Sequence, residues 1–148
     1  PTQSFDDYFQ KFAKRNHEPV IGLETVDKQI EVLFKSIPLE RQKQLLMCLV
    51  DNTEYYNMVT QRLSDAYFAQ NMKQIEEVIS EKRNDSCDDT KEEYAIMFDN
   101  RNADWVAKMP AIMSDKPTFF AVGAGHLPGE KGVLNLLKLA GYEVEAVK

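Results

Sequence analysis

The sequence predicts an α/β or α+β fold, in which a small, mainly parallel sheet contains a large helical insertion. The C-terminal residues alternate between an apolar run, FFAV at 119–122, a helical pattern, GVLNLLKLAG at 132–141, and a second apolar run, YEVEAV at 142–147. So short a crossover favours parallel strands with a right-handed connection. Another apolar run, PVIGLE, lies far upstream at 19–24, and the residues between, about 25–113, have mostly helical patterns.

The N-terminal elements follow from capping residues and apolar spacing. Ser4 is a suitable N-cap for an amphipathic helix that ends at Arg15 and has acidic residues in its first turn. The run at 19–24 predicts a short buried strand. Thr25 then caps a helix that runs to about Ser36.

The central region reads as helix up to about Lys82, starting with Pro38 in a first turn and with a weak point near 51–53. The polar stretch KRNDSCDDT is the clearest loop, and a long helix follows from about 90 to 113, with Pro110 as a point of disturbance.

The C-terminal unit comprises a strand at about 117–123, a helix at 130–139 and a strand at 142–147, and Gly141 fits the C-cap of that helix.

Length and charge restrict the classes of protein. With 148 residues the chain is expected to form a single domain, 1–148, with a real hydrophobic core. The formal net charge of −6 disfavours a general nucleic-acid binder, because phosphate contacts need a basic face. No apolar run approaches the roughly 20 residues of a membrane-spanning helix. Because the sequence starts at Pro1 without a signal peptide, we expect a leader or a larger upstream region.

The two cysteines indicate little about function. Cys48 lies in the apolar LLMCLV and is expected to be buried, whereas Cys87 lies in the polar NDSCDDT and is expected to be exposed. A thiolate metal site is not expected without a C-x-x-C motif, and whether the two cysteines pair stays open.

Candidate site residues gather where two predicted strands end. Glu24 ends the first strand and His126 follows another, so both would lie at the carboxyl edge of a parallel sheet, where ligands bind. Gly22 leaves space beside Glu24, and Gly123 and Gly125 permit a sharp turn or a close approach of a ligand. Each residue also has a structural interpretation: Glu24 as a carboxylate before a helix, and His126 as an ordinary turn residue.

The long helix supplies two further candidates. Arg101 and Asn102 interrupt the apolar face that contains Trp105, which we expect to be a core residue. A buried guanidinium requires a carboxylate or an anion opposite, and Glu24 or a ligand would serve. The alternative is that Arg101 extends to solvent along its aliphatic stem.

Three segments resemble the TraB/GumN family: GLET at 22–25, MFDNRNADW at 97–105 and FFAVGAGHLPGEKGVLNLLKLAGYEV at 119–144. The family belongs to a wider group with the TIKI metalloproteases and, more remotely, erythromycin esterases and haem-binding ChaN proteins. The resemblance implies that this chain is the C-terminal half of a domain about twice as long. In it GAGH at 123–126 would be the second of two G-x-x-H motifs. His17 lacks the motif's glycine and is expected on the surface.

The resemblance implies a metal-dependent hydrolase of peptide or ester bonds. His126 and Glu24 would bind Mn, Co or Zn in the intact protein, with Glu24 as a ligand or as the general base. Arg101 and Asn102 would stabilise developing negative charge. Two ligands are fewer than the usual three, so we expect this fragment to be inactive and to bind metal weakly or not at all.

Other interpretations stay open. The chain could be a non-catalytic module of the cell envelope that binds a metal, haem or an anion, or an interaction domain that uses an apolar stripe at 63–79. The resemblance implies export to the periplasm or cell envelope. A homodimer through the exposed sheet edge is a further expectation. The substrate is expected to be a peptide or a small molecule.

Overall fold

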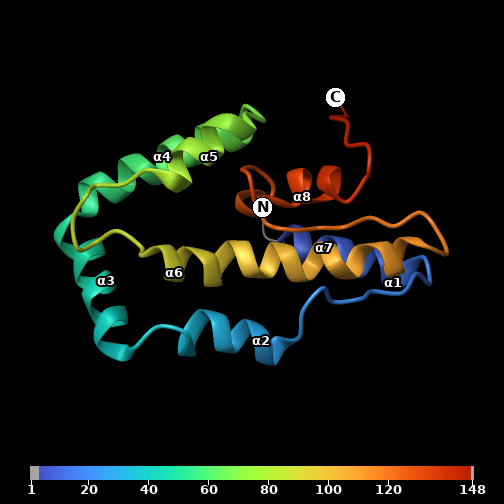
Figure 1. Cartoon of the computed structure of the whole chain (residues 1–148), viewed down its shortest axis with the longest axis horizontal. Coiled ribbons are helices and arrows are strands. Elements are labelled where there is room, and N and C mark those ends of the chain that lie inside the picture. Colours follow the sequence, from blue (N-terminus) through green and yellow to red (C-terminus); the bar gives the residue numbers. More distant parts are fainter. Residues whose placement is uncertain (1–3, 148) are drawn as a thin grey trace.

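The computed structural model describes residues 4–147 and consists of helices and connecting segments. Residues 1–3 and 148 of the predicted domain lie outside the described residues. The α-helices are α1 (Phe5–Arg15), α2 (Val26–Ile30), α3 (Leu39–Asp51), α4 (Thr53–Phe68), α5 (Met72–Ser80), α6 (Lys91–Tyr94), α7 (Asn100–Met113) and α8 (Val133–Leu139). Two π-helical turns, η1 (Glu31–Lys35) and η2 (Ala95–Asp99), extend α2 and join α6 to α7, and a 3-10 turn, η3, spans Ala124–His126. In Figure 1 the α6–η2–α7 segment forms one long rod, with α2 on one side and α8 on the other.

The predicted parallel sheet is wrong, because no residue between 4 and 147 is in a strand. Three segments were predicted as strands: 19–24, 117–123 and 142–147. Within the described part of the chain, no backbone hydrogen bond joins any two of them. The region 25–113 is therefore a helical body rather than an insertion between strands.

The physical reason lies in what these segments contact. A short apolar run can lie extended, but a strand also needs a neighbour about 4.8 Å away. Phe120 and Val122 instead pack against the helical core formed by α7 and α8. Phe119, on the opposite face, is 70% exposed, and Val20 and Ile21 are exposed as well.

The predicted helix starts are confirmed where a side chain caps them. The Ser4 hydroxyl accepts from the Asp7 N–H at the start of α1, and the Thr25 hydroxyl accepts from the Lys28 N–H at the start of α2. Thr90 caps α6, and the predicted break at 51–53 separates α3 from α4. These local hydrogen bonds satisfy amide donors that have no partner within the helix.

Two predicted boundaries shift at proline and glycine. Pro38 is the N-cap of α3 rather than part of its first turn, and Pro110 lies within α7 without ending it. The last helix begins at Val133 instead of 130, because residues 129–132 form a turn. Gly129 has a φ of +93° there, and a side chain on Gly132 would overlap the carbonyl of Pro128.

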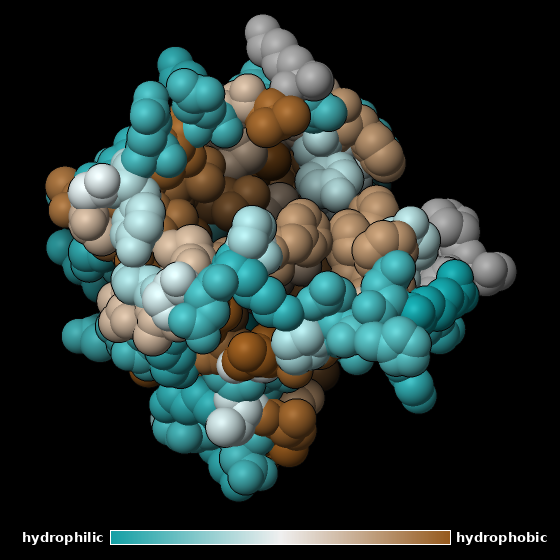
Figure 2. Space-filling model, turned by 90° about the vertical axis from the view of Figure 1, so that its right-hand side faces the viewer, coloured by the Kyte–Doolittle hydropathy of each residue, from teal (hydrophilic) through white to brown (hydrophobic). Residues whose placement is uncertain are grey.

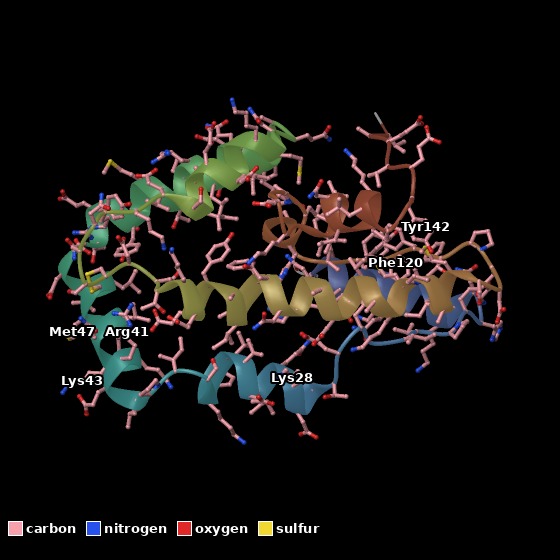
Figure 3. The ribbon with its side chains drawn as sticks, in the orientation of Figure 1. Lys28, Arg41, Lys43, Met47, Phe120 and Tyr142 are labelled. Atoms are coloured by element: carbon pink, nitrogen blue, oxygen red, sulfur yellow. A yellow bond between two sulfur atoms is a disulfide. The ribbon has the colours of Figure 1, made fainter. Side chains whose placement is uncertain are left out.

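A disulfide between Cys48 and Cys87 ties α3 to the loop before α6. It lies near Arg41, whose guanidinium forms an ion pair with Glu93 at 2.8 Å and donates to the carbonyls of Ser86 and Asp88 (Figure 3). The sequence does not indicate whether Cys48 and Cys87 pair, and the structure shows that they do. The loop is therefore anchored both covalently and by a largely buried ion pair.

The hydrophobic core is small for the length of the chain. Its main cluster consists of Trp105, Val106, Met109 and Val133. The accessible surface is 11196 Å², whereas a compact protein of this mass exposes about 7,700 Å². Figure 2 shows hydrophobic side chains gathered in and around a hollow on one face, with hydrophilic residues at its rim. Among the described residues, no helix has the length and apolar character to cross a membrane.

Candidate functional site

The four predicted site residues lie together, although no sheet brings them there. Glu24 precedes α2, Arg101 and Asn102 are in the first turn of α7, and His126 ends η3. Hydrogen bonds connect all four side chains in the order Glu24, Arg101, His126, Asn102. The cluster therefore joins three segments that are far apart in the sequence.

Glu24 and Arg101 form a two-pronged ion pair with little exposure to solvent. Arg101 Nη2 donates to Glu24 Oε1 at 2.7 Å and Nε donates to Oε2 at 3.1 Å, with side-chain exposures of 15% and 8%. Trp105 Nε1 donates to the same Oε2 at 3.3 Å. Burial alone would raise the pKa of Glu24, but the hydrogen bonds and charge of Arg101 lower that pKa below its usual value. Glu24 is therefore an anion at neutral pH.

Asn102 holds one tautomer of His126. Its Nδ2 donates to the carbonyl of Lys131 at 2.9 Å, so its Oδ1 faces His126 Nδ1 at 2.7 Å and accepts a hydrogen bond from the Nδ1–H group. His126 Nε2 then carries the lone pair, and it lies 3.3 Å from Arg101 Nη1. Asn102 is 3% exposed and its amide is engaged at both ends. Its amide thus orients the imidazole and does not face a pocket.

His126 is neutral at physiological pH. Burial lowers the pKa of its imidazole to about 4, and the positive charge of Arg101 acts in the same direction, against a smaller opposing effect of Glu24. The ring packs between aromatic neighbours, with its centroid 4.5 Å from that of Trp105 and 5.0 Å from that of Phe98. Burial and a neighbouring cation keep the ring unprotonated.

The three predicted loop-shaping glycines differ in how tightly they are enclosed. A Cβ on Gly22 would lie 2.9 Å from the backbone oxygen of Glu24, and one on Gly125 would lie 3.0 Å from Ile79. A Cβ on Gly123 would meet His126 at 3.6 Å, an ordinary contact. Close approach therefore requires glycine at 22 and restricts position 125, but not 123.

A pocket of about 220 Å³ opens beside the ion pair. Its lining residues are Glu24, Thr25, Lys28, Arg101, Asp104, Trp105 and Lys108. Lys28 lies on α2 (Figure 3) and pairs with Glu31 at 3.1 Å, and Lys108 Nζ donates to the carbonyl of Leu23 at 2.7 Å.

The sequence reasoning missed most of this pocket. Asp104, Trp105 and Lys108 follow Arg101 by three, four and seven residues, which is the spacing of one helix face. That spacing could have identified them as neighbours of the site. Trp105 is a core residue as predicted, and it is also a hydrogen-bond donor to Glu24.

The arrangement does not fit a divalent metal bound by Glu24 and His126. Both oxygens of Glu24 accept from Arg101, and the lone pair of His126 faces the same guanidinium. Within residues 4–147, no group of three or more His, Cys, Asp or Glu side chains is arranged to hold a metal. A cation between the two predicted ligands would lie against a positive charge.

Comparison with known proteins gives a family but no individual relative. No curated protein and no solved structure matches the chain. The model of the TraB/PrgY/gumN family matches residues 1–146, nearly the whole sequence, and it includes every residue of the cluster. This chain is a member of the TraB/PrgY/gumN family.

Proposed function

We propose that the cluster of Glu24, Arg101, Asn102 and His126 is part of a hydrolytic site that acts on a peptide or ester bond. The observation that supports it best is the state of His126. A neutral imidazole with Nδ1–H held by Asn102 keeps Nε2 unprotonated. In this structure Nε2 accepts from Arg101 Nη1 at 3.3 Å, and it would accept a proton from water once a bound substrate draws Nη1 away. A partner that orients the base is a recurring feature of such sites.

Arg101 has a second role in this proposal. Of its five N–H donors, four bond to Glu24, Met97 and His126, and one has no partner among the described residues. Arg101 lines the pocket, so the remaining donor can bond to a carbonyl oxygen that gains negative charge. Glu24 would hold the guanidinium in place. This proposal includes no metal ion, because the atoms of Glu24 and His126 that would bind one face the guanidinium of Arg101.

Turnover by the purified protein, including any residues that flank these 148 in its natural chain, tests this proposal. A panel of fluorogenic esters and short peptides would be assayed with the wild type, His126→Gln and the matched control His17→Asn. His17 is exposed with a φ of +57°, a conformation that Asn tolerates. We expect loss of at least about 100-fold in rate for His126→Gln and none for the control. Equal rates in all three proteins, or no turnover of any substrate by the wild type, would contradict the proposal.

A binding module without chemistry is the second candidate. The pocket is lined by three cations, Lys28, Arg101 and Lys108, against the carboxylates of Glu24 and Asp104, although the chain as a whole has a net charge of −6. Lys28 is already paired with Glu31, so the ammonium of Lys108 and the remaining donor of Arg101 are the groups that favour an anionic ligand. This candidate would be supported if the wild type turned over no substrate and the His126→Gln variant still bound a carboxylate ligand. The stripe at 63–79 is a poorer basis for a partner, because Ile75 and Val78 are buried where α4 and α5 pack together.

We propose that the protein is exported to the periplasm or cell envelope. The pair Cys48–Cys87 is a disulfide between an α-helix and a loop, and such bonds persist in oxidising compartments such as the periplasm. Trapping of free thiols in freshly lysed cells tests it: labelling of both cysteines in most molecules would contradict export.

A further inference from the structure

Four acceptor atoms around Arg101 converge on one positive charge. Glu24 Oε1 and Oε2 lie 2.7 and 3.1 Å from guanidinium nitrogens, the carbonyl of Met97 lies 3.0 Å away, and His126 Nε2 lies 3.3 Å away. A carboxylate, a backbone carbonyl and a neutral imidazole are also the groups with which proteins bind divalent cations. The site thus has the acceptors of a cation site, and a side chain of the protein supplies the cation.

We propose that Arg101 is the resident cation of this site, and that its guanidinium excludes divalent metal from the acceptors of Glu24, Met97 and His126. This inference differs from the metal dependence that the resemblance implied. It does not depend on whether the chain hydrolyses anything, because it concerns what the acceptors bind.

The guanidinium is difficult to displace for three reasons. It stays charged at all accessible pH values, so deprotonation does not vacate the position. Its Cζ lies 4.9 Å from the centroid of the Trp105 ring, which covers one face. Its departure would leave the buried carboxylate of Glu24 without its cation, an arrangement that proteins strongly disfavour.

The outer side of Glu24 offers no alternative position for a metal. On that side the pocket includes one other carboxylate, Asp104, together with the ammonium groups of Lys28 and Lys108. A divalent ion there would have two carboxylates near three cations, counting Arg101. The positive charges among these lining groups oppose the binding of a divalent cation.

Titration with Co²⁺, followed by visible absorption and calorimetry, tests the proposal. We expect no saturable binding by the wild type up to about 1 mM. Arg101→Met removes the charge and keeps much of the side-chain length, so it should bind Co²⁺ at least about tenfold more tightly, a change of about 1.4 kcal/mol. The control, Arg41→Met, removes a comparable guanidinium paired with Glu93 on the other side of the molecule, and it should bind no better than the wild type.

Two results would overturn the proposal. The first is saturable binding of Co²⁺ by the wild type at micromolar concentration that His126→Gln abolishes. The second is that the Arg101→Met variant is folded, as judged by circular dichroism, and binds Co²⁺ no more tightly than the wild type. If Arg101→Met does not fold, Arg101→Gln takes its place, and the wild-type titration stays decisive. Turnover plays no part in any of these readouts, so failure of the proposed hydrolysis would be seen separately.

Discussion

Acidification from pH 7 to pH 5 should destabilise the folded chain through His126. Folding lowers the pKa of this imidazole from an ordinary value of 6.5 to about 4, so the unfolded chain takes up its proton at higher pH. The stability that follows from the neutral ring is fully present above pH 6.5 and is lost as the pH falls toward 4. With these two pKa values, the free energy of unfolding should decrease by about 2 kcal/mol between pH 7 and pH 5.

Urea unfolding at the two pH values measures this difference. Folding lowers the pKa of Glu24 too, so its contribution is lost only at more acidic pH, and the interval from 7 to 5 reports mainly the histidine. His126→Gln should remove most of the pH-dependent difference, whatever its effect on stability at pH 7. His17→Asn, at the only other histidine, should keep it. A wild type equally stable at both pH values, or a His126→Gln variant that still loses about 2 kcal/mol, would refute the reasoning.

Two further predictions concern stability, and a third concerns the tautomer of His126. Glu24→Gln leaves the buried guanidinium beside it without a carboxylate and should lower the free energy of unfolding by about 3 kcal/mol, measured by urea unfolding. Reduction of Cys48–Cys87, 39 residues apart, should lower it by about 4 kcal/mol, seen by comparing unfolding with and without reductant. Asn102→Leu removes the acceptor of the imidazole proton, so ¹H–¹⁵N spectra should show one tautomer of His126 in the wild type and a mixture in the variant. A single unchanged tautomer in both proteins would contradict that role.

The helices could be predicted from the sequence because their signals are local. Ser4, Thr25 and Thr90 each precede a helix and each makes its capping bond within three residues. The break at 51–53 is likewise a local feature. Such bonds form within a few residues and need no knowledge of what packs around them.

The sheet was wrongly predicted because pairing is not local. The apolar run at 117–123 indicates that its side chains can be buried, and Phe120 and Val122 are indeed packed against the core. The pattern does not report which backbone, if any, lies beside the segment. Here the neighbours are helices, so the apolar run is buried on one side without strand pairing.

The convergence of the site residues could be anticipated, but the roles of the individual groups could not. Asn102 was assigned to charge stabilisation, and the structure instead places its amide between His126 and the carbonyl of Lys131. That carbonyl belongs to a turn that depends on Gly129 and Gly132. A hydrogen bond to a backbone atom 29 residues along the chain has no signature in residue types, unlike a local capping bond, which is why the sequence could not indicate this contact.

The large accessible surface of the folded chain determines how it should respond to denaturant and heat. An unfolded chain of this mass exposes about 24,600 Å², so unfolding from 11196 Å² uncovers about four fifths of the area that a compact protein of equal mass would uncover. The slope of unfolding free energy against denaturant and the heat-capacity change both scale with this area. The transition should therefore be broad, and the dependence of stability on temperature should be flatter than the chain length alone suggests.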